Sequence, residues 1–180
     1  MARLTQVADG DATPETADLF GAIRKKIGMV PNLYRVAGNQ PAALAGLLGL
    51  NEALAGGGFD ARTREAIALT VAGANGCDYC ASAHAAISSG LKVPPEAIED
   101  HLLGRSTDPR MAAILSFATD IVERRGMVSD ADVSRARAAG LTDADIVETV
   151  ANVVANIFTN YLNNVAKTDI DFPPRRARAA

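Results

Sequence analysis

The sequence predicts an all-α protein, and three observations carry this prediction. No stretch shows the alternation of polar and apolar residues that a half-buried strand requires. Apolar residues instead recur three or four positions apart, between residues that start or end helices. Aromatic residues make up only 4% of the chain and tryptophan is absent, so the core must be built from Ala, Leu, Ile and Val. Such small side chains suit closely packed helices.

The first four predicted helices are delimited by proline, asparagine and glycine. Thr13-Pro14 begins the first, because proline is favoured in a first helical turn. Asn39–Pro41 begins the second, and Gly56-Gly57-Gly58 ends it. Asp60 caps the third, and Asn75-Gly76 ends it with residues that tolerate a left-handed backbone. The fourth helix follows at once and carries the two cysteines of the chain.

The second half of the chain repeats these signals. Pro94-Pro95 begins a short helix, and Asp108-Pro109 begins a longer one with a single apolar stripe. Ser129 caps a helix that Gly140 ends, and Thr142 with Asp145 resembles a capping box. The predicted helices, about eight in number, span approximately residues 14–27, 41–54, 61–74, 77–90, 95–102, 109 onward, 129–139 and 142–165. We therefore expect a single-domain helical bundle.

The last predicted helix is apolar over most of its surface, so we expect it to be buried. Its polar remainder includes Asn152, Asn156 and Asn160, which lie four residues apart and therefore share one face. Asparagine at such positions often bonds across a helix pair and fixes its register. A row at the domain surface is the alternative. We favour a row buried against another helix, which a second subunit could provide.

Composition and charge limit the domain organisation and the function. We expect a flexible segment at 1–15, a helical domain at 16–172 and a solvated basic tail at 173–180, which contains Arg175, Arg176 and Arg178. A net charge of −3 gives no field that attracts nucleic acid or anionic lipid. The start of the chain has no apolar run for a signal peptide, and the longest uncharged stretch contains five asparagines. These features predict a soluble, cytoplasmic protein.

The residues whose side chains could carry out a reaction are Glu65, Cys77, Cys80 and His84. Two cysteines three apart in a first helical turn place both sulfurs on one side, close enough for a disulfide. The helix N-terminus favours a thiolate, which is the reactive form of cysteine. His84 lies one turn after Cys80 and can relay a proton. Glu65, from the preceding helix, can orient that imidazole if the Asn75-Gly76 turn folds the two helices together.

The sequence also allows other roles for the cysteine pair. The pair could bind zinc together with His84 and Glu65, although no second cysteine pair exists. It could also be two inert buried cysteines. Covalent haem attachment needs histidine directly after the second cysteine, where this chain has Ala81. A thioredoxin fold needs strands, which the sequence does not predict. His101 lies outside this group, and we expect it at the surface.

The spacing of these residues resembles the alkylhydroperoxidase D / carboxymuconolactone decarboxylase-like superfamily, whose peroxidase members carry glutamate, then Cys-x-x-Cys, then histidine. The stretch 64–84 is similar to the peroxidase-related branch, as are Val30-Pro31-Asn32-Leu33-Tyr34 and the segment 156–162. The resemblance covers about residues 17–172. One departure is Tyr79, which stands between the cysteines where the alkylhydroperoxidase itself has histidine. We take Tyr79 as a candidate for contact with substrate.

The resemblance implies an all-helical subunit that assembles into trimers or hexamers. It implies that Cys80 attacks peroxide and becomes a sulfenic acid, that Cys77 resolves it as a disulfide, and that Glu65 and His84 relay protons. An external dithiol, of dihydrolipoyl type in the best-known members, would reduce the disulfide. No metal, haem or flavin cofactor is implied. Helix geometry alone would make Cys77 the more exposed thiolate, whereas the family and the His84 spacing favour Cys80.

Three functions are therefore in competition. The first is a thiol peroxidase that reduces hydrogen or alkyl hydroperoxides. The second is a general disulfide reductase or redox sensor that uses the same cysteine pair. The third is a non-enzymatic oligomeric protein that binds a small apolar ligand or a partner between its helices. The decarboxylase branch lacks this cysteine pair, so its reaction is not expected.

Overall fold

The computed structural model describes residues 2–177, and within them all regular structure is helical, as the sequence predicts. A 3₁₀ turn (Asp9–Asp11) precedes nine α-helices in this range. They are α1 (Pro14–Ile27), α2 (Asn32–Ala37), α3 (Pro41–Ala55), α4 (Ala61–Asn75), α5 (Asp78–Gly90), α6 (Pro95–Leu102), α7 (Pro109–Glu123), α8 (Asp130–Ala138) and α9 (Asp143–Ala166). None of these helices is long and apolar enough to cross a membrane.

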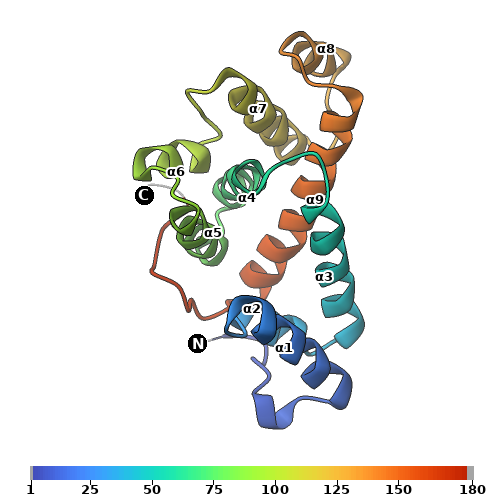
Figure 1. Cartoon of the computed structure of the whole chain (residues 1–180), viewed down its shortest axis with the longest axis vertical. Helices are drawn as coiled ribbons and strands as arrows, with labels where there is room; N and C mark the ends of the chain where they lie inside the picture. Colours follow the sequence, from blue (N-terminus) through green and yellow to red (C-terminus); the bar gives the residue numbers. More distant parts are fainter. Residues whose placement is uncertain (1, 178–180) are drawn as a thin grey trace.

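Helix α4 is the centre of the bundle. It packs against α5, α6, α7 and α9, which surround it in Figure 1. Eight consecutive residues of α4, from Ala66 to Gly73, are buried. The approach of α6 requires glycine at position 73, because a Cβ there would lie 1.9 Å from the backbone oxygen of Leu102. A central helix buried on all sides gives its side chains fixed positions, and Glu65 lies at its start.

The predicted caps are present and explain where the helices begin. Thr13, Asp60 and Asp108 each accept a hydrogen bond from a backbone N–H in the first turn of their helix. Ser129 and Thr142 each form a complete capping box, with Asp132 and Asp145 in the reciprocal positions. The prediction missed only α2, because six residues are too few to show a helical period in the sequence.

Both terminal segments pack more closely than the sequence indicated. In the N-terminal segment, the Val7 N–H donates to the Arg35 oxygen at 3.2 Å, and Asn39 Nδ2 donates to the Thr5 oxygen at 2.6 Å. Near the C-terminus, the Arg175 N–H donates to Ser82 Oγ at 2.8 Å, and Ala177 is buried. The expectation of a solvated tail is therefore wrong for Arg175 and Ala177, since α5 offers polar partners that the sequence did not reveal, whereas Pro173, Pro174 and Arg176 are exposed. Arg178 lies outside the described residues.

His101 is also placed differently from the prediction. His101 is only 7% exposed, so it does not lie at the surface. Helix α6 is amphipathic, and His101 shares its buried face with Ile98 and Leu102. The backbone oxygen of His101 accepts a hydrogen bond from Thr70 Oγ1 of α4 at 2.8 Å. Burial lowers the pKa of this imidazole, so it packs as a neutral group in the α4–α6 contact.

Candidate active site

The turn between α4 and α5 brings the four predicted site residues together. Gly76 takes a left-handed backbone conformation with a φ of 61°, which ends α4 and reverses the chain. Cys77 then caps α5, and its Sγ accepts the N–H of Cys80 at 3.4 Å. The two helices lie side by side, so that Glu65 of α4 faces His84 of α5. The sequence prediction of this hairpin is confirmed.

Both cysteines are free thiols and both are buried, with exposures of 0% for Cys77 and 2% for Cys80. The expectation that helix geometry exposes Cys77 is therefore wrong. The reason is that Cys77 lies in the closed turn between α4 and α5. There it packs with Cys80 in a hydrophobic cluster that also contains Leu69, Ile98 and Leu102. Whatever reacts with these sulfurs must reach the interior of the subunit.

The two thiols have opposite acid–base properties. The Cys77 thiol donates a hydrogen bond to the Cys80 sulfur, and this bond together with burial raises the pKa of Cys77. The same bond lowers the pKa of Cys80 to about 6, with further contributions from the charge of His84 and the amides of Asn163 and Asn160. Cys80 is therefore the thiolate near neutral pH, and Cys77 keeps its proton.

His84 and Glu65 form an ion pair on one side of Cys80. The distance from His84 Nδ1 to Glu65 Oε2 is 2.7 Å, and their side chains are 21% and 18% exposed. Burial acts to lower the pKa of His84, but the Glu65 carboxylate and the negative charge on Cys80 outweigh it, so the pKa is raised. The raised pKa favours the imidazolium next to the Cys80 thiolate, and an imidazolium can give up its proton to a leaving group.

Tyr34 of α2 extends this side of the site, although the sequence analysis gave it no chemical role. Burial raises the pKa of its hydroxyl, and the negative charge of Glu65 adds to this effect. The phenol is therefore a neutral neighbour of the carboxylate. The only sequence signal for it was its place in the segment 30–34 that resembles the family.

Asn163 contacts the Cys80 sulfur, although the sequence analysis did not single it out. Its Nδ2 donates to Cys80 Sγ at 3.2 Å, and the residue is buried. It lies three residues after Asn160, at the end of the predicted asparagine row. Asn160 is fully buried, and its Oδ1 accepts a bond from Asn75 Nδ2 of α4 at 3.1 Å. The end of the row thus meets another helix as expected, but this helix belongs to the same chain.

Tyr79 lines a hollow beside the site together with Gly76 and Asn163, and its hydroxyl is already bonded within the chain. Its hydroxyl accepts the N–H of Leu33 at 3.0 Å and donates to Asp171 Oδ1 at 2.8 Å. Its ring meets that of Phe172 edge-on, with centroids 5.9 Å apart. Burial raises the pKa of this phenol well above its ordinary value. The side chain ties α5 to α2 and to the segment after α9.

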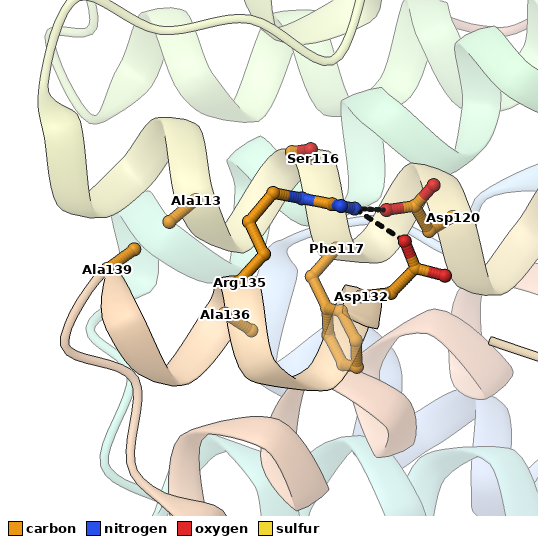
Figure 2. A pocket seen from close by; sticks show the side chains of 8 residues that line it. All are labelled: Ala113, Ser116, Phe117, Asp120, Asp132, Arg135, Ala136 and Ala139. Atoms are coloured by element: carbon orange, nitrogen blue, oxygen red, sulfur yellow. Dashed lines mark hydrogen bonds and ion pairs between the residues drawn. The ribbon is translucent and has the colours of Figure 1, made fainter. Parts of the chain in front are cut away.

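Two hollows lie near charged residues. The first, of about 370 Å³, borders the site: Asn163 forms part of its wall, with Gly76, Lys167 and Thr168. The second, of about 180 Å³, lies between α7 and α8, away from the cysteines (Figure 2). There Arg135 bridges Asp120 and Asp132 at 2.8 and 2.7 Å, and Arg124 pairs with the same two carboxylates, so the two positive charges balance the two negative ones. Within residues 2–177, no group of three or more His, Cys, Asp and Glu residues is arranged to hold a metal ion.

The fold and the site together define an all-helical protein with a buried, polarised cysteine pair. Residues 41–120 match the carboxymuconolactone decarboxylase family. The fold is similar to that of an alkylhydroperoxidase AhpD core, an uncharacterised peroxidase-related protein from Ralstonia eutropha JMP134, with a TM-score of 0.83 and 24% identity over 94% of this chain and 92% of that one. These findings confirm the resemblance to the alkylhydroperoxidase D / carboxymuconolactone decarboxylase-like superfamily.

Two further solved structures share the fold. An uncharacterised peroxidase-related protein from Silicibacter sp. TM1040 has a TM-score of 0.80 and 24% identity over 97% of this chain and 92% of that one. The debrominase Bmp8, solved also as a variant in complex with 2,3,4-tribromopyrrole, has a TM-score of 0.78 and 20% identity over 93% of this chain and 91% of that one. No curated protein matches the sequence. At these identities the structures establish the fold, and the chemistry must be argued from the site.

Proposed function

We propose that this protein is a thiol-dependent peroxidase that reduces hydrogen peroxide or alkyl hydroperoxides. The observation that carries the proposal is the grouping of two free thiols, Cys77 and Cys80, with the His84–Glu65 pair, an arrangement that lowers the pKa of Cys80 and raises that of Cys77. A peroxidatic thiolate and a resolving thiol need this difference. The burial of both sulfurs favours a small oxidant.

The first chemical step uses Cys80, His84 and Glu65. The Cys80 thiolate attacks one peroxide oxygen, an S–O bond forms, the O–O bond breaks, and the electron pair leaves with RO⁻. The imidazolium of His84 supplies the proton that converts RO⁻ to ROH, and Glu65 holds the ring in place. The products are the Cys80 sulfenic acid and an alcohol, or water when the oxidant is hydrogen peroxide.

The second step uses Cys77. Its sulfur attacks the sulfenic sulfur, and its proton leaves with the hydroxide as water, so that a Cys77–Cys80 disulfide remains. An external dithiol, of dihydrolipoyl type, then reduces this disulfide by thiol–disulfide exchange. The cycle requires no metal or organic cofactor.

The decisive experiment is a thiol count before and after one equivalent of peroxide. We expect the loss of two thiols per chain, with no cross-linked dimer on a non-reducing gel. Cys80→Ser should abolish peroxide consumption with dihydrolipoamide as reductant. Cys77→Ser should still form a sulfenic acid, which dimedone would trap. Turnover that survives Cys80→Ser would contradict the proposal.

A disulfide reductase or redox sensor is the second candidate, because the same cysteine pair could exchange with another disulfide. Reduction of a small disulfide without consumption of peroxide would select it. Metal analysis of the purified protein tests the zinc alternative independently. Two thiols inert to oxidant and to alkylating agents in the native state would instead favour a non-enzymatic binding protein.

Assembly into a homo-oligomer, a trimer or hexamer, is part of the same proposal. One face of α9 carries exposed apolar side chains three or four residues apart, which are Val147, Val150, Val154, Phe158, Tyr161 and Val165. We call these six residues the α9 stripe. Leu50 of α3 is exposed as well, on the helix that packs beside α9. A continuous apolar surface of this kind is typical of a protein–protein contact, and an identical subunit supplies a matching face.

A further inference from the structure

Two buried amide atoms close to Cys80 have no hydrogen-bond partner among the described residues. They are Nδ2 of Asn160, a donor, and Oδ1 of Asn163, an acceptor. The residues are 0% and 3% exposed. Buried polar atoms are nearly always satisfied, because an unpaired one loses its bonds to water without compensation. Each of these two atoms can therefore form a hydrogen bond with a small polar group that comes close to Cys80.

The partners of the other amide atoms fix which way each amide points. Asn75 Nδ2 donates to Asn160 Oδ1, so the nitrogen of Asn160 is the atom that is turned toward Cys80, whose thiolate it helps to stabilise. Asn163 Nδ2 donates to Cys80 Sγ, so its oxygen is the atom left free. Both amides lie close enough to Cys80 to help lower the pKa of its thiol. The open donor and the open acceptor thus belong to groups that surround the reactive sulfur.

We propose that Asn160 Nδ2 and Asn163 Oδ1 bind the two oxygen atoms of the hydroperoxide while Cys80 attacks it. This inference rests on the proposed function and adds the residues that hold the substrate. The O–H of the attacked oxygen donates to Asn163 Oδ1. Asn160 Nδ2 donates to the other oxygen, on which negative charge develops as the O–O bond breaks. This charge is then neutralised by the proton from His84.

The shape of the site also defines the substrate class. Asn163 lies in the wall of the 370 Å³ hollow, where Thr168 Oγ1 is a further buried polar atom without a partner, and Ile170 adds an apolar side. The organic group of an alkyl hydroperoxide can occupy this hollow, and Asn163, which lies in its wall and also donates to Cys80 Sγ, connects the hollow to the reactive sulfur. The site therefore accepts hydrogen peroxide and small organic hydroperoxides.

The test compares two reactions of the same sulfur. Oxidation by peroxide uses both amides, whereas alkylation by iodoacetamide depends on the thiolate and needs no donor for a departing alkoxide. We expect Asn160→Ala to slow single-turnover oxidation by about 10²-fold, as removal of an oxyanion donor does. Alkylation above the pKa of Cys80 should change by less than about threefold. Asn156→Ala is the matched control, since Asn156 only donates to the Asn152 oxygen on α9.

The outcomes separate this proposal from the proposed function. Equal losses in oxidation and alkylation would reduce Asn160 to a group that stabilises the thiolate, and would overturn the oxygen site. Unchanged oxidation in Asn160→Ala would overturn it as well. A wild-type protein that does not react with peroxide would overturn the function itself. If the alanine variant does not fold, Asn160→Leu keeps a side chain of similar size and removes the donor without adding a charge, and should show the same selective loss.

Discussion

Glu65 and His84 are 19 residues apart in sequence, yet their Oε2 and Nδ1 atoms lie 2.7 Å apart across the α4–α5 hairpin. Cys80 lies one helical turn before His84 on α5. The charge of His84 lowers the pKa of Cys80, and the charge of Cys80 raises the pKa of His84, so that each favours the charged form of the other. The carboxylate therefore acts on the thiol through the imidazole. This makes Glu65 a positioning residue, whose effect should appear in pH profiles.

Glu65→Gln should move the reactivity of Cys80 to higher pH. Without the carboxylate the pKa of His84 falls, less imidazolium faces the sulfur, and the pKa of Cys80 rises from its value of about 6. The pH profile of iodoacetamide alkylation measures this shift directly. Peroxide turnover at pH 7 should fall by about 10²-fold, the usual contribution of a proton relay. Glu123→Gln, at the exposed end of α7, should leave the profile unchanged. An unshifted profile in Glu65→Gln would contradict the coupling.

Tyr79→Phe should lower stability and leave the chemistry of Cys80 largely intact. The substitution removes the hydroxyl that joins the Leu33 N–H to Asp171. Two polar groups lose a partner, which costs about 1–2 kcal/mol in the free energy of unfolding. Urea denaturation measures this loss. Thr107→Val is the control, because it also removes a hydroxyl and Thr107 is exposed in the loop before α7. A variant of normal stability with altered kinetics toward peroxides would instead return Tyr79 to the substrate contact expected from the sequence.

The sequence predicted the hairpin that carries the site because its signals are local. Cap residues, glycines and an i, i+4 spacing act within one or two turns, so Gly76, Cys77, Cys80 and His84 could be placed before any packing was known. Only the approach of Glu65 to His84 needed a tertiary step, and a tight turn between two helices leaves few ways to make it.

The remaining features depend on contacts between distant segments. Asn163 meets Cys80 across 83 residues of sequence, and no local pattern separates it from the other asparagines of α9. The burial of His101 and the packing of Arg175 and Ala177 against α5 could not be predicted, because isolated residues of these kinds show no burial signal in the sequence. Cys77 was expected to be exposed since a helix end usually meets solvent, whereas here it lies inside a closed turn.

Val154→Asp should dissociate the proposed oligomer. Val154 is 53% exposed in the middle of the α9 stripe, so a carboxylate there costs little in the monomer and much in a dry contact between subunits. Light scattering coupled to size exclusion should show monomers in place of trimers or hexamers. Met127→Asp is the control, because Met127 is 77% exposed and lies outside the stripe, between α7 and α8. If Val154→Asp forms assemblies of the same molecular mass as the wild type, the subunit contact does not use the α9 stripe. If the wild-type protein is itself a monomer, the proposed oligomer does not form.

Asp132→Asn should destabilise the α7–α8 corner at neutral pH and much less in acid. The Asp132 carboxylate is 4% exposed and accepts bonds from the Ser129 N–H at 2.8 Å and the Ser129 hydroxyl at 2.7 Å, and it pairs with Arg124 and Arg135. The bond from the Ser129 backbone, then that from its hydroxyl and that from Arg135, hold the pKa of Asp132 far below its usual range. A depressed pKa adds stability that is complete above the unfolded value of about 3.9 and disappears as the pH falls through the lower folded value.

The difference between wild-type and Asp132→Asn urea midpoints should therefore be large at pH 7 and shrink below about pH 4, as the unfolded carboxyl becomes protonated. Asp143→Asn is the matched control, since Asp143 pairs with Arg137 but its side chain is 78% exposed, and an exposed pair contributes little. A difference that stays constant from pH 7 to pH 3 would mean that Asp132 acts through packing and shape, with no contribution from its charge.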